Sequence, residues 1–548
     1  MPDDDPPESP ARQRTGKAAT GKGAPSIAAL ALVAGLAAAC TSGHSASSTS
    51  SSAPIGIAPA PGCPVGEVAG GPKGCYVVPA GIHKIKHVIV IMQENRSFDT
   101  YFGTFPGADG IPMKDGVPTV CVPNPLTHVC DKPFHDVYDI NGGGPHGESV
   151  AIGDVGKGKV KMQGFIAAVV HAKQTCNNPQ DPACVFVESD GRSGEPDVMG
   201  YHTAAEIPNY WTYAKDFVLD DHMFEPVKSW SEVDHMYLVS GWAAHCTSDN
   251  PMSCKTDIGS PYGGAAFNAA VAQEMAGEST NIDLAWTDET WLLHMDHVSW
   301  GYFVQTGYQP DCSVDNDETC KAVPQSYRST GIWNPLPLFT DVHEDRQLNN
   351  VQPLDNFLIE CKKGTLPSVS WITPSGPDSE HPPSSVHQGQ AYVTSLINAI
   401  MKSPDWSSTA IFLSWDDWGG FYDNVVPPVI DAQGYGLRVP SIVISPYAKK
   451  GYIDHETLSS DAYLKFIEDD FLGGARLNPK SDGRPDPRPD VREDVPQLGN
   501  LVNDFNFNQT PRPPVLLPTN PPSDSPTLPA YFKGKPPCYG CTVQPPAH

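Results

Sequence analysis

Adjacent oxygen-bearing side chains follow two apolar stretches of this 548-residue chain. The pair Glu94–Asn95 comes one residue after the stretch 87–92, and the pair Asp416–Asp417 directly follows the stretch 409–415. Carboxylate and amide oxygens are ligands for divalent cations, so two such pairs could share one metal ion. For either pair taken alone, an ordinary polar turn or a helix cap is the alternative interpretation.

Both stretches have the composition of buried strands. Residues 88–92 are rich in valine and isoleucine and do not alternate with polar residues, which is typical of a central parallel strand covered on both faces. Open α/β sheets place their chemistry at the carboxyl ends of such strands. After the second pair, Gly419–Gly420 permits the sharp turn that two adjacent ligands would need.

Strand and helix patterns alternate through the rest of the chain. Further strands are expected at 368–373 and 439–445, and amphipathic helices are expected around 392–400 and 463–471. This alternation predicts an α/β fold with a mainly parallel central sheet and helices on both sides. The loop-rich stretch 105–195 is expected to be an insertion over the functional edge of the sheet.

The N-terminal region resembles an export signal. Basic residues within 12–22 precede the apolar run 27–39, which is too short to span a membrane. The sequence around Cys40 resembles a bacterial lipobox, which predicts a lipid-anchored protein, although Ala37 stands where leucine is usual and ordinary cleavage after Ala39 is the alternative. The expected regions are a signal peptide (1–39), a flexible tether with the first disulfide (40–80), a catalytic domain (81–510) and a Pro-rich C-terminal extension (511–548).

Charge and cysteine content narrow the function further. The net charge is −27, from 63 acidic and 36 basic residues, which disfavours binding to nucleic acid or to an anionic bilayer. An acidic protein can still act on phosphate esters if a bound cation reverses the local sign. Close cysteine neighbours predict short-loop disulfides in an oxidising compartment, with Cys361 left as a free buried thiol, and zinc binding at the 538–541 pair is the alternative. The expected pairs are Cys63–Cys75, Cys121–Cys130, Cys176–Cys184, Cys246–Cys254, Cys312–Cys320 and Cys538–Cys541.

Several motifs, in order along the chain, resemble those of the bacterial phosphoesterase family. They are Gln93-Glu-Asn-Arg-Ser-Phe-Asp99 with Tyr101-Phe-Gly103, Trp333-Asn-Pro-Leu-Pro-Leu338, Glu380-His-Pro382, Trp415-Asp-Asp-Trp-Gly-Gly-Phe-Tyr-Asp423 and Val439-Pro-Ser-Ile-Val-Ile-Ser-Pro-Tyr447. That family contains non-haemolytic-type phospholipases C and secreted acid phosphatases. The resemblance implies an alkaline-phosphatase-like three-layer α/β/α fold and covers roughly residues 83–510.

The resemblance also implies roles for individual residues. Glu94, Asn95, Asp416 and Asp417 match the family's metal ligands, and Ser231 falls at the position of the nucleophile, which is itself expected to contact the metal. Ser229 is the fallback, because the local sequence Ser-Trp-Ser-Glu-Val-Asp departs from the family pattern. His381 and His146 match family histidines and are expected to protonate the leaving group, and His235 is a weaker candidate.

Two departures from the family pattern concern the second metal pair. Trp418 replaces an asparagine or histidine, and Asn424 replaces a histidine, so a secondary ligand or proton donor could be missing. Aromatic residues in the motifs could suit a quaternary ammonium headgroup, although tryptophans commonly fill cores.

The sequence predicts a metal-dependent phosphoric ester hydrolase of phospholipase C type that acts through a phosphoserine. A secreted acid phosphatase acting on phosphomonoesters is the second hypothesis, and a non-catalytic surface protein of the same fold is the third. One or more divalent ions are expected. Oxygen ligands favour calcium, magnesium or manganese, and zinc also accepts carboxylates.

Overall fold

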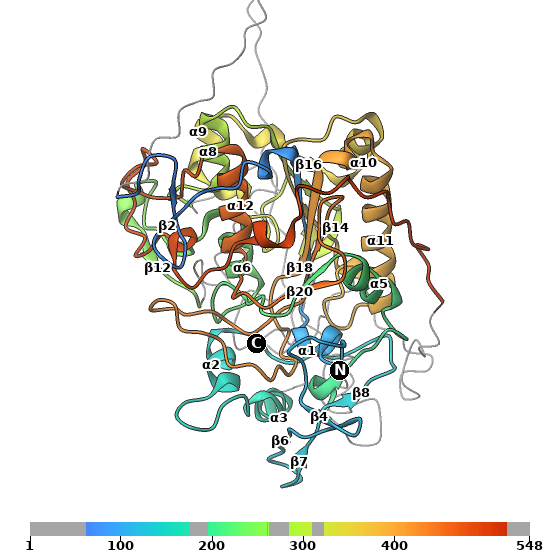
Figure 1. Cartoon of the computed structure of the whole chain (residues 1–548). Coiled ribbons are helices and arrows are strands. Elements are labelled where there is room, and N and C mark those ends of the chain that lie inside the picture. Colours follow the sequence, from blue (N-terminus) through green and yellow to red (C-terminus); the bar gives the residue numbers. More distant parts are fainter. Residues whose placement is uncertain (1–61, 176–195, 260, 262–283, 310–322, 523–548) are drawn as a thin grey trace, which may run out of the picture. The chain divides into compact units, whose positions relative to one another are not determined.

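An eight-stranded sheet forms the centre of the molecule (Figure 1). The computed structural model describes residues 62–175, 196–259, 261, 284–309 and 323–522, which all belong to one unit spanning 55–548. The strands in spatial order are β16 (Val351–Pro353), β13 (Trp300–Val304), β17 (Val369–Thr373), β3 (His87–Gln93), β18 (Thr409–Trp415), β19 (Ser441–Ile444), β10 (Val218–Asp220) and β20 (Tyr452–Asp454).

The four strands expected from the apolar stretches all occur in this sheet. Strand β3 pairs in parallel with β17 on one side and with β18 on the other, and its residues 88–91 have no exposed surface. Strand β19 is antiparallel to both of its neighbours. The reason is local: residues 416–440 contain no helix that could carry the chain back across the sheet, so β19 returns from the edge where β18 ends. The sheet is therefore mainly, but not wholly, parallel.

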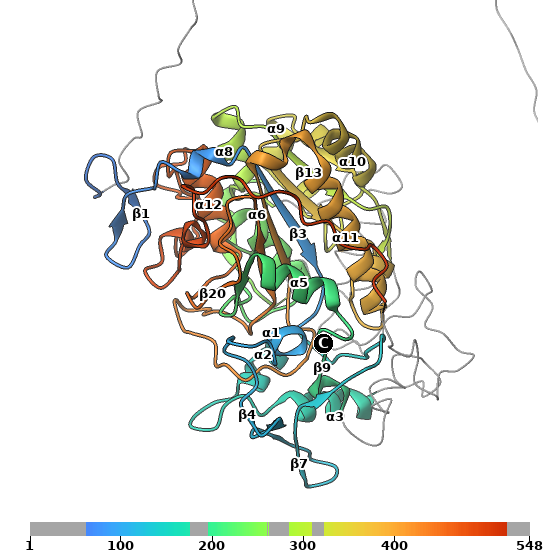
Figure 2. The same cartoon turned by 45° about the vertical axis from the view of Figure 1, so that its right-hand side comes forward.

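Helices pack on both faces of the sheet. One group comprises α5 (Pro208–Asp216), α10 (Leu354–Lys363) and α11 (Val386–Lys402), and the other comprises α6 (Ser231–Ser240), α8 (Glu289–Met295), α9 (Thr340–Glu344) and α12 (Asp461–Phe471). Figures 1 and 2 show these groups on opposite sides of the strands. The apolar residues expected to share one face of α11, including Leu396, Ile397 and Ile400, are buried. The α/β architecture expected from the alternating pattern is confirmed.

The residues after β3 form a separate layer at the carboxyl edge of the sheet. This layer contains α1 (Phe98–Phe102), α2 (Glu148–Val155) and α3 (Phe165–Thr175), with short ladders β4 (Met113–Lys114) to β5 (Val117–Pro118), β6 (Val122–Pro123) to β7 (Cys130–Asp131) and β8 (Phe134–His135) to β9 (Gly200–Tyr201). Figure 2 shows β3 pointing toward this layer. Helices α2 and α3 share a hydrophobic cluster with Trp418 and Tyr422, which follow β18. The insertion therefore packs against the loop after β18, which carries Asp416 and Asp417.

Three of the expected disulfides are present among the described residues: Cys63–Cys75, Cys121–Cys130 and Cys246–Cys254. Cys361 is free and buried, as expected. The other three expected pairs lie outside the described residues. The short ladders β1 (Val68–Ala69) to β2 (Cys75–Tyr76) and β11 (Ala244–His245) to β12 (Lys255–Thr256) each include a bonded cysteine or adjoin one. A further ladder joins β14 (Gly307–Gln309) to β15 (Val323–Gln325).

The described part of the Pro-rich tail runs as extended chain along the helices of one face. The Asn398 side chain on α11 donates to the Leu517 carbonyl at 2.7 Å, and the Asn209 side chain on α5 donates to the Pro518 carbonyl at 2.8 Å. These contacts attach residues 517–518 to α5 and α11. None of the described helices combines the length and the apolar character needed to cross a bilayer.

Candidate metal centre and nucleophile

The two oxygen-bearing pairs meet at the carboxyl edge of the sheet. Strands β3 and β18 are in register at their last residues, so the residues that follow emerge side by side. The Asn95 backbone N–H donates to Asp416 Oδ1 at 2.9 Å, and the Asn95 side-chain amide donates to Asp417 Oδ1 at 3.0 Å. All four residues, including Glu94, are buried. The convergence expected from two neighbouring strand ends is therefore observed.

Two tight backbone turns, one at Asn95 and one at Gly419–Gly420, make this convergence possible. Asn95 has a φ of 60°, a left-handed conformation that asparagine tolerates better than most residues. Gly419 and Gly420 have φ values of 61° and 74°. A Cβ atom on Gly419 would lie 2.7 Å from the Asn95 carbonyl oxygen, and one on Gly420 would lie 2.6 Å from the Gly144 backbone. Glycine is needed at both positions for steric as well as conformational reasons.

Ser231 faces this pair of strand ends from the first residue of α6. Its hydroxyl donates to Asp417 Oδ2 at 3.1 Å, and the residue has no exposed surface. The start of a helix also favours negative charge, which an ionised serine would carry. The fallback residue points elsewhere, because the Ser229 hydroxyl donates to the backbone carbonyl of Ile258. Of the two serines, Ser231 is therefore the one in the centre.

His235 lies close to two of the candidate metal ligands, which the sequence did not predict. It lies one helical turn after Ser231 on α6, and its Nε2 atom is 3.1 Å from Glu94 Oε1 and 4.0 Å from Asp416 Oδ2. One ligand atom from each of these three residues lies within 4.8 Å of the others. In the sequence, the signal for His235 was its position four residues after Ser231. That spacing predicted a proton donor rather than a metal ligand.

His146 lies beside Asn95, and His381 lies beside His146. His146 Nε2 is 3.0 Å from the Asn95 side-chain nitrogen, and the two imidazole rings are 5.9 Å apart. Each ring is held at Nδ1 by a backbone carbonyl, of Gly144 for His146 and of Pro382 for His381. If Nδ1 donates in each ring, then Nε2 is the basic nitrogen, which is the arrangement a proton-transfer histidine needs.

The carboxylates of the centre are crowded, and one of them was not found from the sequence. Glu225 is fully buried, and burial, followed by repulsion from Asp234 and Asp417, raises its pKa well above the usual range. Glu225 Oε1 accepts from the backbone N–H groups of Trp418 and Leu437. Nothing in the local sequence distinguishes this residue from an ordinary loop glutamate. A small cavity of about 10 Å³ lies between Glu225, Asp234 and Asp416.

The donor set fits a divalent cation. Within the described part of the chain, Asp416 Oδ2 and Asn95 Oδ1 are buried and accept no hydrogen bond. Buried polar atoms are normally paired, so two such oxygens beside Glu94 and His235 suit a metal ligand set. Carboxylate, amide and imidazole ligands together are compatible with calcium, manganese or zinc.

The two departures from the family pattern have structural roles. Trp418 is fully buried, and its Nε1 donates to Asp154 Oδ2 on α2 at 3.1 Å. Asn424 accepts from the Arg438 guanidinium at 3.0 Å. Trp418 therefore attaches the insertion to the loop after β18, and Asn424 completes a buried network around Arg438.

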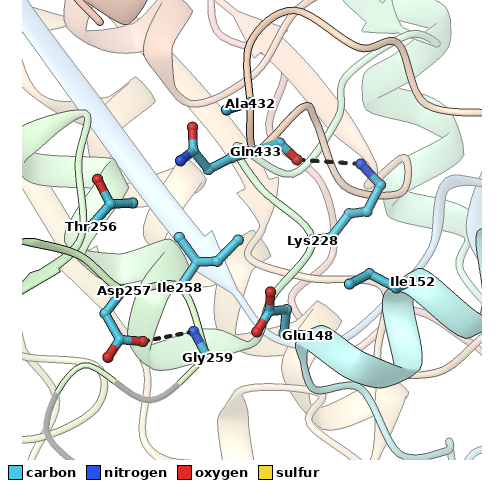
Figure 3. A pocket seen from close by; sticks show the side chains of 9 residues that line it. All are labelled: Glu148, Ile152, Lys228, Thr256, Asp257, Ile258, Gly259, Ala432 and Gln433. Atoms are coloured by element: carbon cyan, nitrogen blue, oxygen red, sulfur yellow. Dashed lines mark hydrogen bonds between the residues drawn. The ribbon is translucent and has the colours of Figure 1, made fainter. Parts of the chain in front are cut away.

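A pocket lies next to the nucleophile loop but does not include the centre (Figure 3). Its volume is about 440 Å³, and its lining includes Glu148, Lys228 and residues 256–259. The same segment holds the nucleophile loop, since Trp230 Nε1 donates to the Gly259 carbonyl at 2.8 Å. Lys228 donates to the Tyr435 carbonyl at 2.9 Å, and Figure 3 shows its second contact, with the Gln433 carbonyl. The candidate catalytic residues themselves are enclosed.

Comparison with known proteins identifies the family of the chain. The model of the Phosphoesterase family matches residues 85–472. Non-hemolytic phospholipase C of Burkholderia pseudomallei is 25% identical over 78% of this chain and 60% of its own length. Hemolytic phospholipase C of Pseudomonas aeruginosa is 26% identical over 71% and 53%, and phospholipase C B of Mycobacterium tuberculosis is 26% identical over 82% of both chains. The chain thus spans little more than half of the first two relatives.

Proposed function

Since the chain belongs to the Phosphoesterase family, we propose that it is a metal-dependent phosphoric ester hydrolase of phospholipase C type. It would cleave a phosphodiester of a phospholipid, such as phosphatidylcholine, into diacylglycerol and a phosphorylated headgroup. The observation that carries this proposal is the buried Ser231 hydroxyl, 3.1 Å from Asp417 Oδ2, within a group of metal-ligating side chains. The names of the three relatives agree with this class of substrate.

The proposed metal ligands are Glu94, Asn95, Asp416, Asp417 and Ser231, to which the geometry adds His235. A bound divalent cation would favour the serine alkoxide and neutralise charge on the phosphoryl oxygens. The Asn95 amide group donates to Asp417 and to His146, so its carbonyl oxygen is left to face the cation. Asn95 thereby orients a ligand and a proton-transfer residue at once.

Ser231 is the proposed nucleophile. Its hydrogen bond to Asp417 aligns the hydroxyl and gives its proton an acceptor as the oxygen attacks phosphorus. The phosphoryl group would pass to Ser231, and water would then hydrolyse the phosphoserine. His146 or His381, in its imidazolium form, would give the Nε2 proton to the departing alkoxide while its Nδ1 stays bonded to a backbone carbonyl; in His146 the Nε2 atom would have to leave the Asn95 amide to do so.

An acid phosphatase that acts on phosphomonoesters is the second proposal. It keeps the same residues, and serine rather than threonine at position 231 favours it by family resemblance. Turnover of a choline phosphodiester and of an aryl phosphate, measured on one purified sample, separates the two. A ratio of kcat/KM above about tenfold for the diester supports the phospholipase, and the reverse ratio supports the phosphatase.

A non-catalytic protein of the same fold would hydrolyse neither substrate. Equal rates for the wild type and Ser231→Ala, on protein whose metal content has been measured, would support that alternative over both enzymes. An alkaline-phosphatase-like fold remains part of the proposal, with the three-layer arrangement and the strand-end metal pairs as its support.

The proposed location is outside the cell, with attachment to the membrane if Cys40 is lipidated. The three disulfides support an oxidising compartment. Residues 1–61, which include the signal and Cys40, lie outside the described residues. Mass spectrometry of the N-terminal peptide of the exported protein tests the anchor, since lipidation adds acyl chains to Cys40 and ordinary cleavage does not. Nucleic acid is not a proposed partner, and the oligomeric state stays open.

A further inference from the structure

A second group of buried carboxylates lies at the carboxyl edge of the sheet, away from the centre around Ser231. Asp220 ends β10, Asp454 ends the neighbouring strand β20, and Asp504 ends the short helix η9 (Leu501–Asp504). One carboxylate oxygen from each residue lies within 4.8 Å of the other two. All three residues are essentially inaccessible to solvent.

The strand register forces two of these carboxylates together. Strands β10 and β20 are parallel, and Asp220 is paired directly with Asp454. Side chains at paired positions share one face of a sheet, and like charges there repel. Asp504 then brings a third carboxylate to the same point from a different element. Three ionised carboxylates this close together destabilise the fold unless a positive charge lies between them.

Few donor groups reach the oxygens of the trio. Across the described residues, four of the six carboxylate oxygens are buried and accept from no N–H or hydroxyl group: Asp220 Oδ1, Asp454 Oδ2 and both oxygens of Asp504. The remaining two accept from the Ser441 hydroxyl at 2.6 Å and from the Glu456 backbone N–H at 3.0 Å. The Asp504 and Asp454 carboxyls are close enough to share a proton, which a cation would replace. Buried carboxylate oxygens that face one another without a donor are the pattern of a cation site.

The surrounding side chains do not neutralise this charge. Within the described residues, no lysine, arginine or histidine forms an ion pair with any member of the trio. The nearest titratable neighbours in sequence are Asp221, His455 and Glu456, and His455 pairs with Asp221 rather than with the trio. Burial, with repulsion inside the trio, raises the pKa of both Asp220 and Asp504 well above the usual range.

We propose that Asp220, Asp454 and Asp504 bind a second divalent cation of the calcium class, separate from the ion beside Ser231. Three carboxylates supply only oxygen, which selects a hard cation. Ligand oxygens on opposite sides of Ca²⁺ are separated by about 4.6–5.2 Å, twice the usual calcium–oxygen distance, so mutual separations within 4.8 Å fit that ion. Water would complete the coordination.

The position of this cation gives it a structural role near the active centre. Strand β10 leads through residues 221–230 into Ser231 at the start of α6. The Asp221 N–H already donates to the Asp454 carbonyl at 3.1 Å, and the Arg438 guanidinium donates to the Asp221 carbonyl at 2.8 Å. A cation between β10, β20 and η9 would hold the start of the nucleophile loop at the edge of the sheet.

Calcium binding to three variants of the full mature protein tests this site. Asp504→Asn replaces one carboxylate oxygen of the trio with an amide nitrogen and removes its charge, Asp416→Asn does the same to a ligand of the proposed active-centre metal, and Glu456→Gln removes one charge beside the trio without changing any of its oxygens. After chelation and dialysis, each protein is titrated with Ca²⁺, with bound calcium and the melting temperature as readouts. Elemental analysis of the proteins before chelation gives the cations retained per chain.

We expect Ca²⁺ to raise the melting temperature of the wild type, Asp416→Asn and Glu456→Gln by about 3 °C at saturation, and that of Asp504→Asn by less than about 1 °C. Asp504→Asn should also retain one cation fewer than the wild type. The site is refuted if Asp416→Asn binds no calcium, or if Asp504→Asn and Glu456→Gln respond alike. The active-centre proposal is tested independently, because its metal is removed only by Asp416→Asn.

Discussion

Two groups of buried acidic residues lie at the same edge of one sheet, and only one of them is equipped for catalysis. The group around Asp417 includes a serine at a helix start, two nearby imidazoles held at Nδ1 and a third histidine, His235, which contacts Glu94. The trio around Asp504 also has a serine beside it, because the Ser441 hydroxyl donates to Asp220, but Ser441 lies in strand β19, and no histidine among the described residues forms an ion pair with the trio. The comparison teaches that buried carboxylates alone do not mark a catalytic group, and that the histidines around Ser231 set the group proposed for catalysis apart from the trio.

The largest expected effect comes from removing Ser231, the serine at the start of α6 beside Asp417. Ser231→Ala should lower kcat for the preferred phosphoester by about 10³-fold or more, because no hydroxyl remains beside Asp417. Ser229→Ala is the matched control, since that hydroxyl contacts Ile258 and its loss should cost less than about tenfold. Steady-state rates on metal-loaded protein give both values. Similar losses in the two variants would reject Ser231 as the nucleophile.

Isosteric amide substitutions in the two groups compare their importance for catalysis. Asp417→Asn removes the charge that receives the Ser231 hydrogen bond and should reduce kcat by about 10²–10³-fold. Asp504→Asn, assayed at a temperature where it is folded, should lose far less because the trio contacts no reacting group. If Asp504→Asn is as inactive as Asp417→Asn while folded, the division between a catalytic and a structural group is wrong.

The effect of the histidines beside the catalytic group on kcat should depend on whether the leaving group needs a proton. His146→Ala and His381→Ala should each reduce kcat by about 10²-fold for substrates with alkoxide leaving groups. The loss should shrink for a nitrophenolate leaving group, which departs without a proton. Rates on the two kinds of substrate provide the measurement, and an equal loss on both would reject proton transfer by these histidines and assign His146 a role in positioning Asn95 instead.

The glycine turn is a further difference between the groups, because the trio needs no such backbone. Gly420→Ala would place a methyl group 2.6 Å from the Gly144 backbone at a φ of 74°, and should destabilise the fold by about 2 kcal/mol. Gly153→Ala in α2, where a Cβ atom meets nothing within 4 Å, is the control and should be neutral or stabilising. Chemical denaturation measures both. An unchanged free energy of unfolding in Gly420→Ala would show that the turn at Gly420 tolerates a side chain.

Much of the metal centre was predictable because it depends on features that are local in sequence. Glu94–Asn95 and Asp416–Asp417 directly follow apolar strands, and paired parallel strands bring their ends together. The position of Ser231 could be predicted only from family resemblance, since a serine before a helix is common. Glu225 and the trio were missed because their proximity depends on residues that are far apart in the chain, as with Asp220 and Asp504. Asp220–Asp221 is an acidic pair after apolar residues, but the apolar stretch 217–219 is too short to predict a strand.

Glu380 shows how hydrogen bonds accommodate a buried carboxylate outside both groups, and its effect appears only as a dependence of stability on pH. Tyr101, Tyr210 and Trp415 donate to it, and burial raises its pKa to about 7, against these hydrogen bonds, which lower it. Because the folded pKa lies above the unfolded value, its favourable contribution is complete below about pH 4.5 and is lost as pH rises through 7.

The wild type should therefore lose up to roughly 3 kcal/mol between pH 5 and 8 from this residue alone. Glu380→Gln should show a flatter dependence of unfolding free energy on pH over that range. Denaturation of both proteins at a series of pH values measures the difference. Parallel curves would mean that Glu380 does not titrate near neutrality.

The most direct test of the central claim is to locate the phosphoryl group during turnover. The metal-loaded protein would be mixed with a phosphoester, quenched in acid within the first turnovers and digested, and the phosphopeptides sequenced by mass spectrometry. Transfer to the hydroxyl beside Asp417 predicts phosphorylation at Ser231. Phosphorylation at Ser229, or label on neither serine while product accumulates in a burst, would contradict the claim.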